Sequence, residues 1–267
     1  MAPWRDAGVA ATVCVVGLFL SREAAAQRLD LDVPLDAASE VNAAVAPTLV
    51  RDSAQDASSI PSGPSTLEGA IVDSMRLLMI EHSTRILVQA KTRNELDGPF
   101  FPDYRRSVKV PDTWSDGDGW VVNYLGHPIH GAAAGFIWLD HEDGAHDPTL
   151  GFSREYWSSR LRGFAWATVY SVQFEFGPAS EASIGNVGMR PGTTGWVDHI
   201  VTPVGALGFM VLEDALDRHL VRRIENWTSN RFVRAVARTG INPSRALSNL
   251  AQGRFPWYRV ARPIGGQ

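Results

Sequence analysis

Three long apolar stretches set the strongest limit on what this chain can fold into. They run over residues 120–139, 156–176 and 196–227, and each has only a few polar interruptions. A helix that is apolar nearly all round must be buried, either in a protein core or partly in lipid. None of the stretches has the roughly 20 uninterrupted apolar residues that a clean bilayer crossing requires. We therefore predict a mainly α-helical protein, with apolar helices packed into a compact bundle.

Small residues indicate how closely these helices pack. Gly131 and Gly135 recur at a spacing of four, and Gly205 and Gly208 recur at a spacing of three. Small residues at such spacings line one side of a helix and let another helix backbone approach closely. Pro203 precedes the second pair and loosens the helix there. Close packing should bring the polar interruptions of the three stretches together.

These polar interruptions are the candidate site. The first stretch supplies Asn123, His127 and His130, the second Glu175 and the third Asp198. Asn123, His127 and His130 stand at i, i+4 and i+7, so they share one helix face. Proline at position 128 is compatible with this arrangement if the helix begins nearby.

Three interpretations of the candidate site stay open from the sequence. Two histidines and a carboxylate on facing helices resemble the way bundles build metal sites, so His127 and His130 could hold a divalent metal. A histidine oriented by Glu175 or Asp198 could instead act as a general base in hydrolysis. A structural hydrogen-bond network is slightly favoured, because buried polar groups must be paired whatever their purpose. No metal is assigned, since HxxH is not the HExxH of zinc proteases.

Other reaction classes are excluded by what the sequence lacks. It has no GxSxG segment, no phosphate-binding loop and no dinucleotide-binding fingerprint. Its only cysteine, Cys14, lies in the apolar run 7–20 near the N-terminus. If this region is removed, the remaining chain has no disulfide, thiol nucleophile or cysteine-bound zinc.

The N-terminal residues have the pattern of a secretory signal peptide followed by a leader. Residues 1–26 combine a short charged start, the apolar run and the small residues Ala24, Ala25 and Ala26. Residues 27–65 are rich in Ala, Ser, Asp and Pro and lack aromatic side chains, which predicts disorder. The helical domain should therefore comprise residues 66–267. Its first helix should begin at Thr66 and bury Leu67, Ile71, Leu78 and Met79 on one face, with His82 at the surface.

Charge is distributed unevenly along the chain. Residues 218–267 hold ten arginines and one acidic residue, a balance of +9, whereas residues 1–217 hold 15 basic and 28 acidic residues, a balance of −13. In the predicted C-terminal helix Arg231, Arg234 and Arg238 share a face. Such a face could meet lipid phosphate, another anion or the acidic part of the same protein. Nucleic acid is the partner least expected for an exported chain.

The order of these segments resembles an uncharacterised bacterial cell-envelope family, domain of unknown function 3943. The resemblance covers about residues 112–252, with an Asn-x-x-x-His-Pro-x-x-Gly segment, a helix ending in Phe-Glu and an Asp-x-x-x-Thr-Pro segment. Matching positions are Asn123, His127, Pro128, Gly131, Glu175, Asp198, Thr202 and Pro203. The sequence departs from the family after Pro203, where Glu213 falls about two residues late. The resemblance implies an exported, mostly helical, envelope-associated protein, and it implies no reaction.

Three functions are therefore hypotheses at this point. The first is an exported envelope protein of the periplasm or outer membrane that is associated with lipid. In it, the polar cluster of the candidate site has a structural or lipid-binding role. The second is a lipid- or cell-wall-directed hydrolase that uses the cluster. The third is a soluble periplasmic binding domain in which the three apolar helices are only a core.

Overall fold

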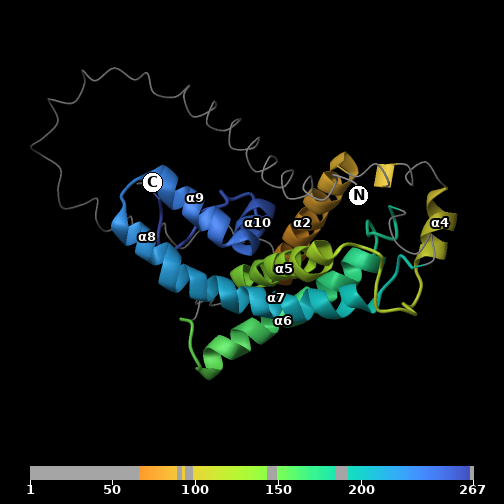
Figure 1. The fold of residues 1–267 in the computed structure, drawn as a ribbon, viewed down its shortest axis with the longest axis horizontal. Coiled ribbons are helices and arrows are strands. Elements are labelled where there is room, and N and C mark those ends of the chain that lie inside the picture. The colour runs from red at the N-terminus through yellow and green to blue at the C-terminus, as the bar shows by residue number, and fades with distance from the viewer. Residues whose placement is uncertain (1–65, 89–91, 94–98, 143–148, 185–191, 265–267) are drawn as a thin grey trace, which may run out of the picture. The chain divides into compact units, whose positions relative to one another are not determined.

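The fold is described from a computed structural model (Figure 1), in which residues 66–88, 92–93, 99–142, 149–184 and 192–264 are described. These residues all belong to a unit that runs from Thr66 to Gln267. The predicted signal peptide, residues 1–26, and the predicted leader, residues 27–65, lie outside the described residues.

Within the described residues the secondary structure is helical and contains no β-strand, which confirms the predicted mainly α-helical fold. The elements are α2 (Thr66–Val88), α4 (Phe100–Ser107), the π-turn η3 (Val122–Gly126), α5 (His127–His141), α6 (Arg154–Phe176), α7 (Trp196–Leu216), the π-turn η4 (Asp217–Val221), α8 (Arg222–Trp227), α9 (Arg231–Ile241) and α10 (Pro243–Ala251). The three apolar stretches became η3 with α5, α6, and the continuous run from α7 to α8.

Helix α5 is the centre of the bundle. It packs against α6 and α7 and also against α2 and α10, which lie on its other side (Figure 1). Its residues from Gly131 to Ile137 are all buried. A Cβ atom added at Gly131 would lie 2.9 Å from the backbone oxygen of Thr202, and one at Gly135 would lie 3.1 Å from that of Gly163. The predicted close packing at these glycines is therefore confirmed.

The start of α5 explains why Pro128 is tolerated in the middle of an apolar stretch. The backbone N–H of His127 donates to the carbonyl of Val122, five residues earlier, so η3 ends where α5 begins. Pro128 then occupies the first turn of α5, where a missing N–H is harmless. π-turns inside helices occur often at functional sites. This one directs His127 into the bundle, where it is 4% exposed.

The predicted buried face of α2 is wrong in part, because Leu78 is buried and other predicted residues are exposed. Leu67, Ile71 and Met79 are about half exposed, whereas the buried side of the helix carries Leu77 and Leu78 together with polar groups. On this side the Ser74 hydroxyl accepts a hydrogen bond from the Trp166 indole, and His82 is buried. The spacing of apolar residues was misleading because the bundle pairs the polar side of α2 with polar groups of α5 and α6.

Candidate functional site

The structure brings His127, Glu175 and Asp198 together from three different helices. One ligand atom of each lies within 4.8 Å of the others. The side chains come from the first turn of α5, the last turn of α6 and the first turn of α7. They are 4%, 5% and 3% exposed. Three helix ends that are distant in sequence therefore bring these side chains together in one buried polar group.

His127 is held between two residues one turn apart on α7. Its Nε2 lies 3.6 Å from Oδ1 of Asp198, and its Nδ1 lies 3.3 Å from the hydroxyl of Thr202. Both ring nitrogens thus face α7. Ser171 of α6 donates to the backbone carbonyl of Asp198, which ties the α7 start to α6.

His130 and Asn123 are buried beside this group and have other partners. Nδ1 of His130 lies 3.6 Å from Oε2 of Glu81, and its ring centroid lies 4.5 Å from that of Phe174. The amide nitrogen of Asn123 donates to Oδ1 of Asp116 over 2.7 Å. The group with metal-ligand spacing is therefore His127 with two carboxylates, in place of the expected His127–His130 pair.

Sequence reasoning missed several polar residues that lie beside this group. Glu81, His82 and Arg85 come from α2, and Arg85 forms an ion pair with Glu181. Nδ1 of His82 also lies 3.7 Å from Oε1 of Glu181. Glu181 returns to the bundle because the chain turns back after α6, and its N–H donates to the carbonyl of Phe174. The one available signal was the placement of Glu81, His82 and Arg85 within one turn.

Burial controls protonation in this cluster. It raises the pKa of Asp198 to about 8, with Asp116 nearby adding to the effect. Burial, followed by the charge of Asp198, holds the pKa of Glu175 well above its usual range. Burial, followed by the positive charge of Arg85, lowers the pKa of His127 to about 4. In the absence of a bound cation, burial therefore favours the protonated carboxyls and the neutral imidazole of His127.

The raised pKa of Glu81 provides a test of how burial affects protonation in this region. Desolvation raises its pKa from 4.5 to about 8, although Tyr170 donates to it over 2.8 Å and Arg85 lowers the value. The groups that face it are His130, Tyr170, Arg85 and Glu181. Between pH 4.5 and 8 the folded protein keeps a proton that the unfolded chain releases, so this contribution is full below pH 4.5 and falls as pH rises.

We expect Glu81→Gln, which cannot ionise, to remove that dependence. Relative to the variant, wild type should lose at least about 1 kcal/mol of unfolding free energy between pH 5 and 7.5. Urea denaturation of both proteins at the two pH values measures the difference. Parallel pH profiles would show that Glu81 ionises normally in the folded protein.

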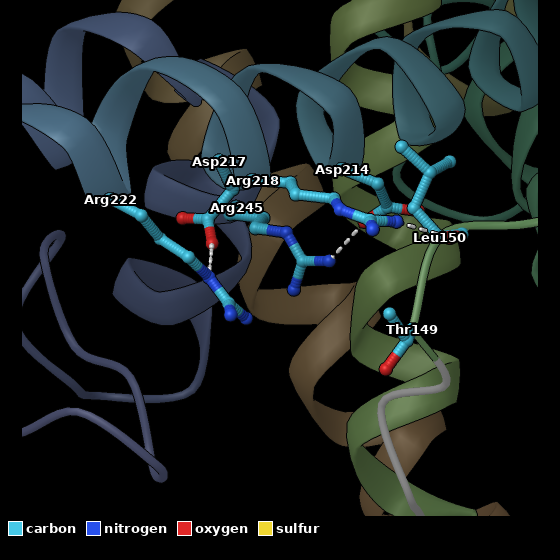
Figure 2. Close-up of a pocket in the computed structure, with 7 residues that line it drawn as sticks. All are labelled: Thr149, Leu150, Asp214, Asp217, Arg218, Arg222 and Arg245. Carbon is cyan, nitrogen blue, oxygen red and sulfur yellow. Dashed lines mark hydrogen bonds and ion pairs between the residues drawn. The ribbon is translucent and has the colours of Figure 1, made fainter.

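A second polar region lies at the far end of α7, where a cavity of about 190 Å³ opens (Figure 2). It is lined by Thr149, Leu150, Asp214, Asp217, Arg218, Arg222 and Arg245. The arginines are tethered: Arg245 donates to Asp214 over 2.5 Å, and Arg218 donates to the carbonyl of Leu150 over 2.7 Å. Charge in this cavity is thus largely balanced by its own carboxylates.

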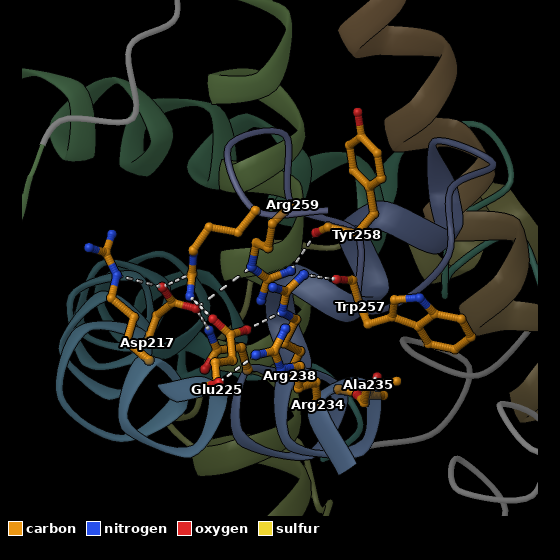
Figure 3. A network of polar contacts seen from close by, with 12 residues as sticks. Asp217, Glu225, Arg234, Ala235, Arg238, Trp257, Tyr258 and Arg259 are labelled. Atoms are coloured by element: carbon orange, nitrogen blue, oxygen red, sulfur yellow. Dashed lines mark hydrogen bonds and ion pairs between the residues drawn. The ribbon is translucent and has the colours of Figure 1, made fainter. Parts of the chain in front are cut away.

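Most arginines of residues 218–267 form ion pairs with acidic groups of the same protein (Figure 3). Arg238 is 2% exposed and donates from Nε to Glu225 over 2.5 Å. Arg234 donates to the carbonyls of Thr228 and Glu225. Of the three arginines predicted to contact lipid or another anion, Arg231 is the exposed one. Arg234 and Arg238 therefore donate hydrogen bonds to groups of the same protein. They reach these groups because the turn after α8 places α9 beside η4 and α8.

Searches against protein-family models, curated proteins and solved structures found no match to this chain. The assignment to the envelope family therefore stays a prediction from the residues that resemble it. Within the described residues, one helix has the length and apolar composition of a membrane crossing, the run Trp196–Trp227. A third of its most apolar window is buried inside the bundle.

Proposed function

We propose that the protein is an exported protein of the bacterial cell envelope that lies against lipid with one outer face of its helix bundle. The observation that carries the proposal is an exposed surface on α6 and α7, which we call the apolar face. It consists of the side chains Trp157, Leu161, Val169, Val172, Trp196, Ile200, Val204 and Leu212, each more than a third exposed. The buried His/Asn/carboxylate cluster has a structural role in this proposal, joining the helices behind the face.

The apolar face is a continuous ridge on each helix. On α7 Trp196, Ile200 and Val204 recur at every fourth residue, so they lie one above another. On α6 Val169 and Val172 are 60% and 51% exposed. Because α6 and α7 pack against each other and cover α5 with their inner sides, their outer ridges lie next to each other and point away from the core.

Exposed charge is absent from the later part of α6, after Arg162, and from most of α7. In the described stretches 163–176 and 196–212, the acidic residues are Glu175 and Asp198, both buried, and no exposed residue is charged. At 1.5 Å per residue these stretches are about 20 and 25 Å long. A helix that faces water normally carries charged or polar residues on its outer side. Exposed apolar patches of this extent mark interaction surfaces.

Aromatic residues lie at the two ends of the apolar face. Trp157 is in the first turn of α6, and Trp196 begins α7, which runs antiparallel to α6. Near Trp196, the rings of Trp120 and Tyr124 stack with their centroids 5.8 Å apart. Such rings favour the boundary between water and lipid. The signal-peptide pattern of residues 1–26 and the family resemblance support export.

The membrane proposal predicts that charges placed in the apolar face abolish lipid binding. The variant Val169→Asp/Val204→Asp should bind vesicles of phosphatidylethanolamine and phosphatidylglycerol at least about ten-fold more weakly than wild type, because two carboxylates would have to enter the interface. Flotation of the full chain with vesicles measures the effect. Val110→Asp is the matched control, since Val110 is 80% exposed in a segment between charged residues and outside the face.

All three proteins share the N-terminal apolar run, so a difference between them reports the bundle itself. Equal vesicle binding by the double variant and the control would refute the membrane proposal. It would also be refuted if the wild-type chain formed a dimer without lipid that the double variant lost, because a second copy would then cover the face. Unchanged circular dichroism of the variants confirms that they fold.

A further inference from the structure

The ligand types and distances of the buried group fit one metal ion. An imidazole nitrogen of His127 and oxygens of Glu175 and Asp198 lie within 4.8 Å of one another, and Nε2 of His127 lies 3.6 Å from Oδ1 of Asp198. Two ligands bound tetrahedrally at about 2.1 Å from one zinc ion are roughly 3.4 Å apart. Small side-chain movements would therefore bring all three atoms to one ion.

Keeping both carboxyls of the group ionised would need a cation paired with them. Arg85, whose charge acts on both carboxyls, is in an ion pair with Glu181. Among the described residues no arginine or lysine forms an ion pair with Glu175 or Asp198. Burial favours the protonated carboxyls when no cation is bound, and a bound metal ion would instead stabilise their ionised forms.

A second observation points to a ligand at the same place. Oδ1 of Asp198 is buried and has no hydrogen-bond partner among the described residues, although buried polar atoms nearly always have one. It faces Nε2 of His127 at a distance too long for a hydrogen bond. The other ring nitrogen of His127 faces the Thr202 hydroxyl at 3.3 Å, a contact of the kind that orients a metal-bound histidine.

We infer that His127, Glu175 and Asp198 form a binding site for one divalent transition-metal ion, of which Zn²⁺ and Mn²⁺ are the best candidates. One imidazole and two carboxylates suit these ions, whereas Mg²⁺ and Ca²⁺ favour oxygen ligands alone. The site joins α5, α6 and α7 at one end of the bundle, so a bound ion would hold the three helices together. This inference is independent of the proposed membrane contact.

The test is metal binding by the full chain after removal of metal with a chelator. Calorimetric titration with Zn²⁺ or Mn²⁺ should give one equivalent and a rise in thermal unfolding temperature, and Mg²⁺ should bind at least about ten-fold more weakly. Asp198→Asn and Glu175→Gln keep the side-chain shape and should each lower the affinity about 100-fold or more. Glu81→Gln, which changes a largely buried carboxyl outside the ligand group, should bind within about three-fold of wild type.

A spectroscopic measurement keeps the test decisive if a variant is unstable. Co²⁺ bound to wild type should give a visible absorption band that His127→Ala lacks while Glu81→Gln retains it. Failure of wild type to bind any of the transition metals saturably would overturn the inference. Equal affinity of wild type, Asp198→Asn and Glu175→Gln would overturn it too, because the ion would then be bound elsewhere.

Discussion

Replacing Glu225 with alanine is expected to lower the free energy of unfolding by about 3–5 kcal/mol. The Glu225 carboxylate accepts from Nε of Arg238 over 2.5 Å and from Nη1 of Arg262 over 2.6 Å. Arg238 is 2% exposed, so the substitution leaves a guanidinium buried without its carboxylate. The loss is a large fraction of the 5–15 kcal/mol that holds a typical domain together.

Urea denaturation followed by circular dichroism measures this loss. Glu142→Ala is the matched control, because Glu142 pairs with Arg162, whose side chain is 49% exposed, and such pairs contribute at most about 1 kcal/mol. The double variant Glu225→Leu/Arg238→Met, which removes both buried charges, should recover most of the stability. A small loss in Glu225→Ala, equal to that of the control, would show that Arg238 reaches water in solution.

Asp214→Ala should also cost about 3–5 kcal/mol, at the other end of the bundle from the His127 group. One Asp214 oxygen accepts from the Tyr156 hydroxyl and from Nε of Arg160, each over 2.7 Å, and the other accepts from Arg245 over 2.5 Å. Arg160 is 1% exposed. The substitution therefore removes the carboxylate that a deeply buried guanidinium and a buried hydroxyl share.

The comparison for Asp214→Ala is Asp140→Ala, which removes a carboxylate that is 37% exposed and bonded to Arg254 and Gln252. We expect that control to lose no more than about 1 kcal/mol in the same denaturation measurement. Asp214→Asn keeps an oxygen acceptor for Tyr156, so it should lose less than Asp214→Ala. Equal stability of Asp214→Ala and wild type would contradict the assigned contacts.

The sequence predicted the helices well and the sides that they bury less well. Apolar length located α6 and α7, and Gly131 located a close helix contact, because both depend on local composition. The buried side of α2 was predicted only in part: Leu78 is buried, but Leu67 and Met79 are exposed although they are as apolar as a core face. Periodicity shows that a helix has an apolar side, and only its neighbours decide whether that side is covered.

The candidate site was predicted in part for a similar reason. His127, Glu175 and Asp198 are conspicuous as polar residues in apolar stretches, and the fold brings them within 4.8 Å. Arg85 and Glu181 did not stand out in this way, because Arg85 comes from the polar side of a helix and Glu181 from a turn outside the apolar stretches. Their roles depend on contacts between segments almost 100 residues apart, which no local pattern encodes.

By itself, therefore, the sequence determined a helical bundle, the identity of its three apolar helices and a set of polar residues that must be satisfied when buried. Local composition is sufficient for this because helix formation follows from neighbouring residues, and a polar group in an apolar helix must be paired once it is buried. Only the tertiary structure decided that Arg238 pairs with Glu225. It also decided that the group with metal-ligand spacing contains His127 and two carboxylates, and that His130 is not part of it. Those choices depend on distances between helices, and packing fixes these distances once the whole bundle has formed.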